Sequence, residues 1–148
     1  MIKRLFFIIA ISLSLAVSQV YAEQSKSFGD YTIHFSAFTT DILTPEVAKA
    51  YRIPRSKNRA LLNISVLKKV MNTAGSPVKA KIKASATNLN SQLRDLDVRE
   101  LDDKSGAIYY IAETTVDNEE VLKYSITVLP EGENENFTFD FQQQFFTR

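Results

Sequence analysis

The feature that most constrains this chain is a period-two alternation of apolar and polar side chains that returns in segment after segment. In the first of these, Tyr31, Ile33 and Phe35 share one face while Thr32 and His34 share the other. Successive side chains of a β-strand point to opposite faces, so this pattern predicts strands with one buried face. The segments that alternate, or do so weakly, are 31–36, 60–67, 78–87, 93–101, 108–113, 122–128 and 137–145. About seven short strands separated by turns predict an all-β fold, an antiparallel immunoglobulin-like β-sandwich.

One short helix interrupts the strands. Thr44 can cap a helix N-terminus, Pro45 suits the first helical position, and Glu46 complements the helix dipole. The sequence predicts about two turns that end near Tyr51, because Pro54 follows and disfavours a longer helix.

The N-terminus predicts export. Lys3 and Arg4 precede the apolar run from Leu5 to Val17, and small or modest side chains follow at Val20 and Ala22. This is the layout of a cleavable signal peptide over residues 1–22, with cleavage between Ala22 and Glu23, and with one β-sandwich domain over residues 23–148. A permanent anchor is the alternative, but a spanning helix needs roughly 20 apolar residues. We therefore expect an exported protein without stable membrane insertion after cleavage.

Composition excludes several classes of function. The chain has no cysteine, which excludes disulfides, thiolate catalysis and lipidation of an N-terminal cysteine. Residues 1–22 hold two of the 18 basic residues and none of the 17 acidic ones, so the remainder carries a net charge of −1. This balance argues against a nucleic-acid partner.

A signal peptide followed by amphipathic strands also fits a small outer-membrane β-barrel, which stays an alternative.

Catalytic and metal-binding patterns are weak. His34 is the one histidine, and the sequence supplies neither a nucleophile motif nor a group to orient it. With no cysteine, a zinc site is not expected, and the acidic turns lack the spacing of a calcium loop. We predict no metal, no cofactor and no assigned catalytic residue. A periplasmic hydrolase that uses carboxylates or His34 is kept as the second alternative, and whether the protein is an enzyme stays uncertain.

A basic segment is the most unusual stretch of the chain. Between Lys49 and Arg59 five residues are basic and none is acidic. Arginine forks bind carboxylates and phosphates, so this segment is the candidate binding site for an anionic ligand or a periplasmic protein. The candidate residues are Arg52, Arg55, Lys57 and Arg59. The alternative is that the segment pairs with the acidic turns at 102–103 or 117–120 of the same domain.

Three stretches of the sequence resemble a known family. They are Phe28-Gly29-Asp30-Tyr31, the run from Leu43 to Ala48, and the run from Arg55 to Ser65. Together they resemble DUF4426, a domain-of-unknown-function family of small exported proteins of Gram-negative bacteria. The resemblance implies a periplasmic β-rich domain, and it carries over no activity and no catalytic residue. The function that we expect is therefore that of a soluble periplasmic binding or protein-interaction module.

Overall fold

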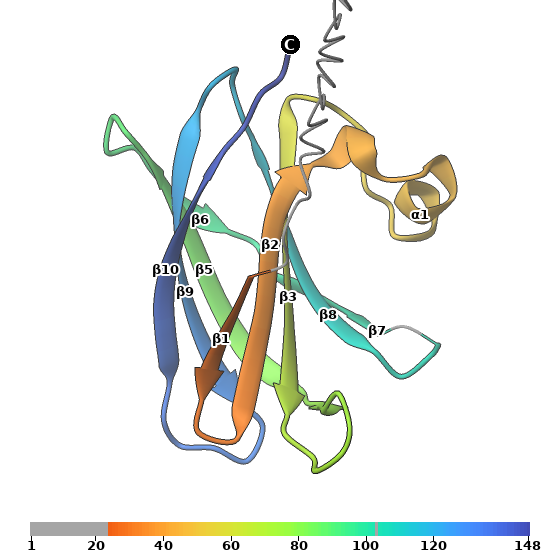
Figure 1. Cartoon of the computed structure of the whole chain (residues 1–148). Helices are drawn as coiled ribbons and strands as arrows, with labels where there is room; N and C mark the ends of the chain where they lie inside the picture. The colour runs from red at the N-terminus through yellow and green to blue at the C-terminus, as the bar shows by residue number, and fades with distance from the viewer. Residues whose placement is uncertain (1–23, 103) are drawn as a thin grey trace, which may run out of the picture.

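The structure, a computed structural model, describes residues 24–102 and 104–148. The predicted signal peptide and its cleavage site lie outside these residues and stay predictions. Two layers of antiparallel strands pack face to face (Figure 1). The elements are β1 (Gln24–Phe28), β2 (Tyr31–Thr39), the 3₁₀ turn η1 (Thr40–Ile42), α1 (Pro45–Ala50), β3 (Arg59–Lys68), β4 (Ser76–Pro77), β5 (Ala80–Asn88), β6 (Leu93–Leu96), β7 (Arg99–Asp102), β8 (Ile108–Thr115), β9 (Val121–Pro130) and β10 (Phe137–Gln144).

The strand order confirms the predicted sandwich. Sheet A has the order β1-β2-β3-β8-β7, with β4 paired to β3, and sheet B has the order β10-β9-β5-β6. Without β1 and β4, these orders match A-B-E-D and G-F-C-C′ of the immunoglobulin fold. The described strands form two separate open sheets and not one closed sheet.

Two predicted boundaries were wrong. Residues 24–28, expected to be a polar lead-in, form β1, which pairs with β2 across the turn at Gly29 and Asp30. The segment 93–101, expected to be one strand, is split into β6 and β7, which belong to different sheets. Together with β4, these differences give ten strands in the described residues where the sequence predicts about seven.

The main core lies between the sheets, and it consists of the side chains that the alternation predicts to be buried. Phe35 of β2 contacts Phe139 and Phe141 of β10, with ring centroids 4.7 Å apart in both pairs. From the middle of β9, Tyr124 and Ile126 are fully buried. Aromatic pairs at this spacing stabilise beyond the area that they bury.

Polar side chains join the two sheets at the start of β5. Tyr110 of β8 donates to Glu100 of β7 at 2.9 Å and accepts from the backbone N–H of Ala80 at 2.8 Å. Lys79 donates to the other oxygen of Glu100 at 2.9 Å. These hydrogen bonds, from Lys79 first and then Tyr110, hold the pKa of Glu100 below its usual range, and burial raises the pKa of Tyr110 to about 12. We call Tyr110, Glu100 and Lys79, together with the backbone N–H of Ala80, the Tyr110 clasp.

The helix forms as the sequence predicts. The Thr44 hydroxyl accepts from the backbone N–H of Val47 at 3.4 Å, and Pro45 occupies the first turn. Helix α1 stands beside the upper ends of β2 and β3, outside the two layers (Figure 1). Within the described residues, no helix is both long and apolar enough to cross a membrane.

Candidate functional site

Sheet A carries a second apolar cluster on its outer face. Outer faces of sandwich sheets are usually polar, but here Leu61 of β3 and Ile111 of β8 are buried on that side, under Ile53 of the segment that follows α1. Phe38, Leu43, Tyr51 and Leu101 pack against them. The outer face of sheet A therefore has a small core of its own.

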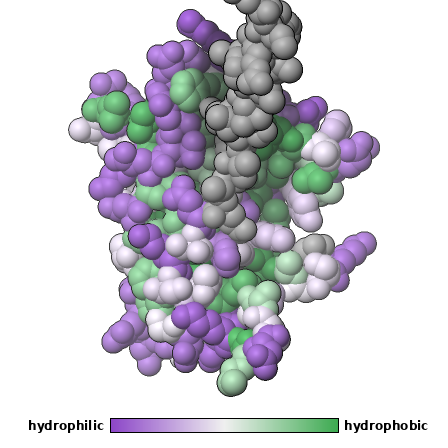
Figure 2. All heavy atoms as spheres, in the orientation of Figure 1, coloured by the Kyte–Doolittle hydropathy of each residue, from purple (hydrophilic) through white to green (hydrophobic). Residues whose placement is uncertain are grey.

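A groove runs along this cluster, and we call it the α1 groove. Its volume is about 170 Å³. Two of its residues, Val47 of α1 and Tyr109 of β8, are 40% and 37% exposed. Apolar side chains reach the surface on this side of the molecule (Figure 2). The lining residues are Phe38, Leu43, Val47, Tyr51, Ile53, Leu61, Asn63, Leu101, Tyr109 and Ile111.

The segment that covers the groove is held by backbone hydrogen bonds and one buried hydroxyl. Thr40 is fully buried, and its hydroxyl accepts from the N–H of Ser56 at 2.9 Å and lies 2.7 Å from the carbonyl of Pro54, to which it donates. The N–H of Ile53 bonds the carbonyl of Ala48 at 2.8 Å, which closes the turn after α1. Thr40 thus fixes the loop at 54–56 and, with it, the position of Ile53 over the sheet.

Charged side chains lie at the end of the groove where β3 begins. Glu113 of β8 contacts Arg59 at 3.4 Å and Arg99 at 3.7 Å, and we call these three residues the Arg-Glu-Arg cluster. Arg99 also donates to the carbonyl of Tyr51, a lining residue of the groove, at 2.8 Å. Two guanidinium groups therefore share one carboxylate beside an apolar surface.

A second recess continues from Tyr109 towards the other end of the sheet. It has a volume of about 210 Å³ and includes His34 and Ser65, which face each other across β2 and β3. The other residues that line it are Leu67, Pro77, Ala107, Ile108 and Tyr109. Apart from His34, Ser65 and Tyr109, the described residues that line this recess are apolar.

The four predicted binding residues take different positions. Arg52 is exposed in a turn with a φ of 55°, and Lys57 is exposed on the following loop. Arg55 donates to the backbone carbonyl of Asp41 at 2.8 Å. Only Arg59 of the four belongs to the Arg-Glu-Arg cluster beside the α1 groove.

The basic segment was expected, as the alternative, to pair with the acidic turns at 102–103 or 117–120, but the ion pairs of these groups have other partners. The partner of Arg59 is Glu113, on a strand. In the acidic turns, Asp102 pairs with Lys79 at 3.8 Å, and Glu120 pairs with Arg94 at 2.7 Å. The loop before β3 is also held by a hydrogen bond of its own, in which the Ser56 hydroxyl accepts from the N–H of Asn58 at 3.1 Å.

The groove residues were not predicted as a site, although one signal was present. The segment 60–67 is apolar on nearly both faces, which indicates a strand covered on both sides. The missing information was which side chains of β2 and β8 lie beside Leu61, and the register supplies it: Phe38 on one side and Glu113 on the other.

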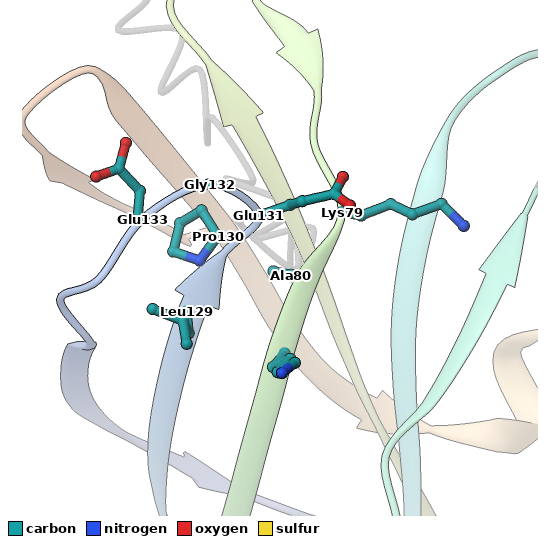
Figure 3. A pocket seen from close by; sticks show the side chains of 8 residues that line it. Lys79, Ala80, Leu129, Pro130, Glu131, Gly132 and Glu133 are labelled. Atoms are coloured by element: carbon teal, nitrogen blue, oxygen red, sulfur yellow. The ribbon is translucent and has the colours of Figure 1, made fainter.

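A larger groove, of about 370 Å³, lies where β5 begins and β9 ends (Figure 3). In Figure 3 the side chains of Lys79 and Glu133 lie on opposite sides of the other labelled residues. Lys79 belongs to the Tyr110 clasp, and Glu133 accepts from the Tyr31 hydroxyl at 2.8 Å. These two charged groups already serve contacts within the domain, so we favour the α1 groove as the candidate site.

Comparison with known proteins gives a family and a fold. The sequence matches the domain of unknown function DUF4426 over residues 25–148. In structure the chain is similar to a DUF4426 family protein from Pseudomonas aeruginosa PAO1, with 32% identity, a TM-score of 0.73, and coverage of 85% of this chain and 96% of that one. A family 123 glycoside hydrolase from Clostridium perfringens is similar only at 11% identity and a TM-score of 0.44, over 78% of this chain and 27% of that one, which is too distant to inform fold or function. No match is found among curated proteins. The chain belongs to the DUF4426 family.

Proposed function

We propose that this DUF4426 protein is an exported, soluble protein-interaction module of the periplasm that holds apolar side chains of a partner polypeptide in the α1 groove. The observation that carries the proposal is the apolar outer face of sheet A, which the α1 segment covers only in part. An apolar surface rimmed by charged groups is typical of interaction sites.

The size of the groove favours a polypeptide over a small molecule. Pockets for small ligands usually measure about 300–1,000 Å³ and bury most of the ligand. The α1 groove, at about 170 Å³, has room for one or two side chains. Protein interfaces concentrate their binding energy in a few such buried anchors.

The chemistry of the lining also favours binding over catalysis. Apart from Asn63 and the two tyrosines, the ten described residues that line the groove are aliphatic or phenylalanine. A catalytic site needs a general acid or base within reach of the reacting group. No carboxylate, histidine or lysine lies among the described lining residues of this groove.

A charge placed in the groove tests the proposal. Val47→Asp places a carboxylate among the residues that line the groove, at a position that is 40% exposed. Val70→Asp is the matched control, because Val70 is 48% exposed in the turn beyond the far end of β3. Each variant and the wild type would be expressed with its signal and a C-terminal tag, cross-linked in intact cells and purified from the periplasm.

We expect a partner that the wild type and Val70→Asp both capture and that Val47→Asp loses. Equal partner profiles for the three proteins would contradict the role of the groove. Mass spectrometry of the protein released by osmotic shock tests the location, and the expected N-terminus is Glu23. A product that retains residues 1–22 and stays with the membrane would contradict export as a soluble domain.

A further inference from the structure

The Arg-Glu-Arg cluster carries one more positive than negative charge. Glu113 serves both guanidinium groups, at 3.4 Å from Arg59 and 3.7 Å from Arg99. The side chains of Arg59 and Arg99 are 36% and 41% exposed, whereas that of Glu113 is 20% exposed. Donor N–H groups of both arginines therefore face solvent beside the groove, while the carboxylate is largely covered.

The segment over the groove adds to this positive charge. Ahead of Arg59, residues 45–58 hold four further basic residues and a single acidic one, Glu46. Low-dielectric walls strengthen the field of nearby charges. The mouth of an apolar groove under a basic segment therefore attracts a group of opposite charge.

On the premise that the α1 groove binds a partner polypeptide, we propose that the bound segment carries an aspartate or glutamate next to its apolar anchor, and that this carboxylate is received by Arg59 and Arg99. Arginine presents paired N–H donors that match a carboxylate, which gives geometric specificity as well as attraction. The apolar anchor alone would fit many exposed segments. The carboxylate therefore supplies the selectivity.

Glu113 competes with the partner for the same guanidinium groups. An incoming carboxylate must share Arg59 and Arg99 with Glu113, which lies against both. Glu113→Gln keeps the shape of the side chain and removes its charge, so it leaves both guanidinium groups uncompensated. The competition gives the proposal a test in which binding improves, a result that a misfolded variant cannot produce.

The probe is a set of peptides selected for binding to the folded domain, residues 23–148. Random peptides displayed between two flanking sequences, so that no chain end is free, would be selected on the wild type. The strongest one would then be synthesised in three forms: as selected, with each Asp or Glu replaced by its amide, and in the amide form with a free C-terminal carboxylate. Dissociation constants would be measured by fluorescence anisotropy at low salt for the wild type, Val47→Asp, Arg59→Gln/Arg99→Gln and Glu113→Gln.

We expect the selected peptide to bind the wild type about tenfold more tightly than its amide form, in line with a charge-assisted hydrogen bond. The double arginine variant should bind the two forms equally, and Glu113→Gln should bind the acidic form more tightly than the wild type does. The addition of 0.5 M salt should weaken the binding of the acidic form only.

The outcomes separate this inference from the proposed function. If Val47→Asp abolishes binding but the wild type does not distinguish acidic from amide forms, the groove binds and the carboxylate proposal is wrong. A preference that appears only with the free C-terminus overturns the assignment to an Asp or Glu side chain. If no selected peptide responds to Val47→Asp, both proposals fail. Vesicles with phosphatidylglycerol that bind in a Val47-dependent manner, in place of any peptide, would also overturn the inference.

Discussion

Thr40→Val should loosen the cover of the α1 groove, because it removes a hydroxyl that two backbone groups depend on. The variant has nearly the same shape as the wild type, but the N–H of Ser56 loses its acceptor at 2.9 Å and the carbonyl of Pro54 loses its donor at 2.7 Å. A buried polar group left without a partner costs about 1–3 kcal/mol. Since both groups are only partly buried, we expect a loss of about 2 kcal/mol in the free energy of unfolding.

Urea denaturation followed by tyrosine fluorescence measures the loss, and for a domain of this size it amounts to a fall of about 1 M in the midpoint. Thr40→Ser is the control, because it keeps the hydroxyl and loses one methyl group, at about 1 kcal/mol. The reasoning is falsified if Thr40→Val unfolds at the same urea concentration as Thr40→Ser or at a higher one.

Limited trypsin digestion gives a local measure of the same change. Arg52, Arg55 and Lys57 are exposed on the segment that Thr40 fixes. Cleavage after these residues requires the segment to open, and its rate follows the free energy of opening. We expect faster cleavage there in Thr40→Val than in Thr40→Ser, with peptides identified by mass spectrometry.

Three further predictions concern the framework of the sandwich. Tyr110→Phe leaves the N–H of Ala80 without its acceptor and should cost about 1–2 kcal/mol at pH 7. Because the pKa of Tyr110 is raised from 10.0 to about 12, its contribution is full below pH 10 and is lost as the pH rises towards 12, so the urea midpoints of wild type and variant should converge between pH 10 and pH 12. Phe35→Ala removes a ring that is 2% exposed and should cost about 3–5 kcal/mol by urea denaturation, and a loss below about 1 kcal/mol would contradict the described core. Gly75→Ala should cost about 1–3 kcal/mol, because φ is +104° and a Cβ would lie 3.1 Å from a backbone carbonyl oxygen, and an unchanged melting temperature would contradict this geometry.

The alternation of side chains predicted the fold because each buried strand has a clean periodic face. The residues of β2 and β9 that alternate in the sequence are those that line the core. The segment 60–67, apolar on both faces, was correctly expected to be central, and β3 pairs with β2 and β8. Local chemistry predicted the start of the helix in the same way, since the cap at Thr44 depends on neighbouring residues only.

The features that the sequence did not reveal depend on contacts between distant segments. Residues 24–28 have almost no apolar side chains, and they become β1 because the backbone of β2 is available across a tight turn. Similarly, the α1 groove requires Phe38, Leu61 and Ile111 to meet on one face, and three different strands supply them. The register between those strands is set by the whole sheet and is not readable from any one segment.

The floor of the α1 groove, to which β3 contributes, and the α1 segment that covers it differ in stability. Leu61 packs under the α1 segment while its neighbours Ala60 and Leu62 pack between the sheets, so the strand is enclosed on both sides. Its amide protons should be among the last in the chain to exchange with deuterium. The cover is a six-residue helix and a loop attached by a few hydrogen bonds, so we expect it to open at a lower free energy than the sandwich unfolds. A partner would therefore meet a surface that is rigid beneath and adjustable above, and its dissociation rate would be set by the adjustable part.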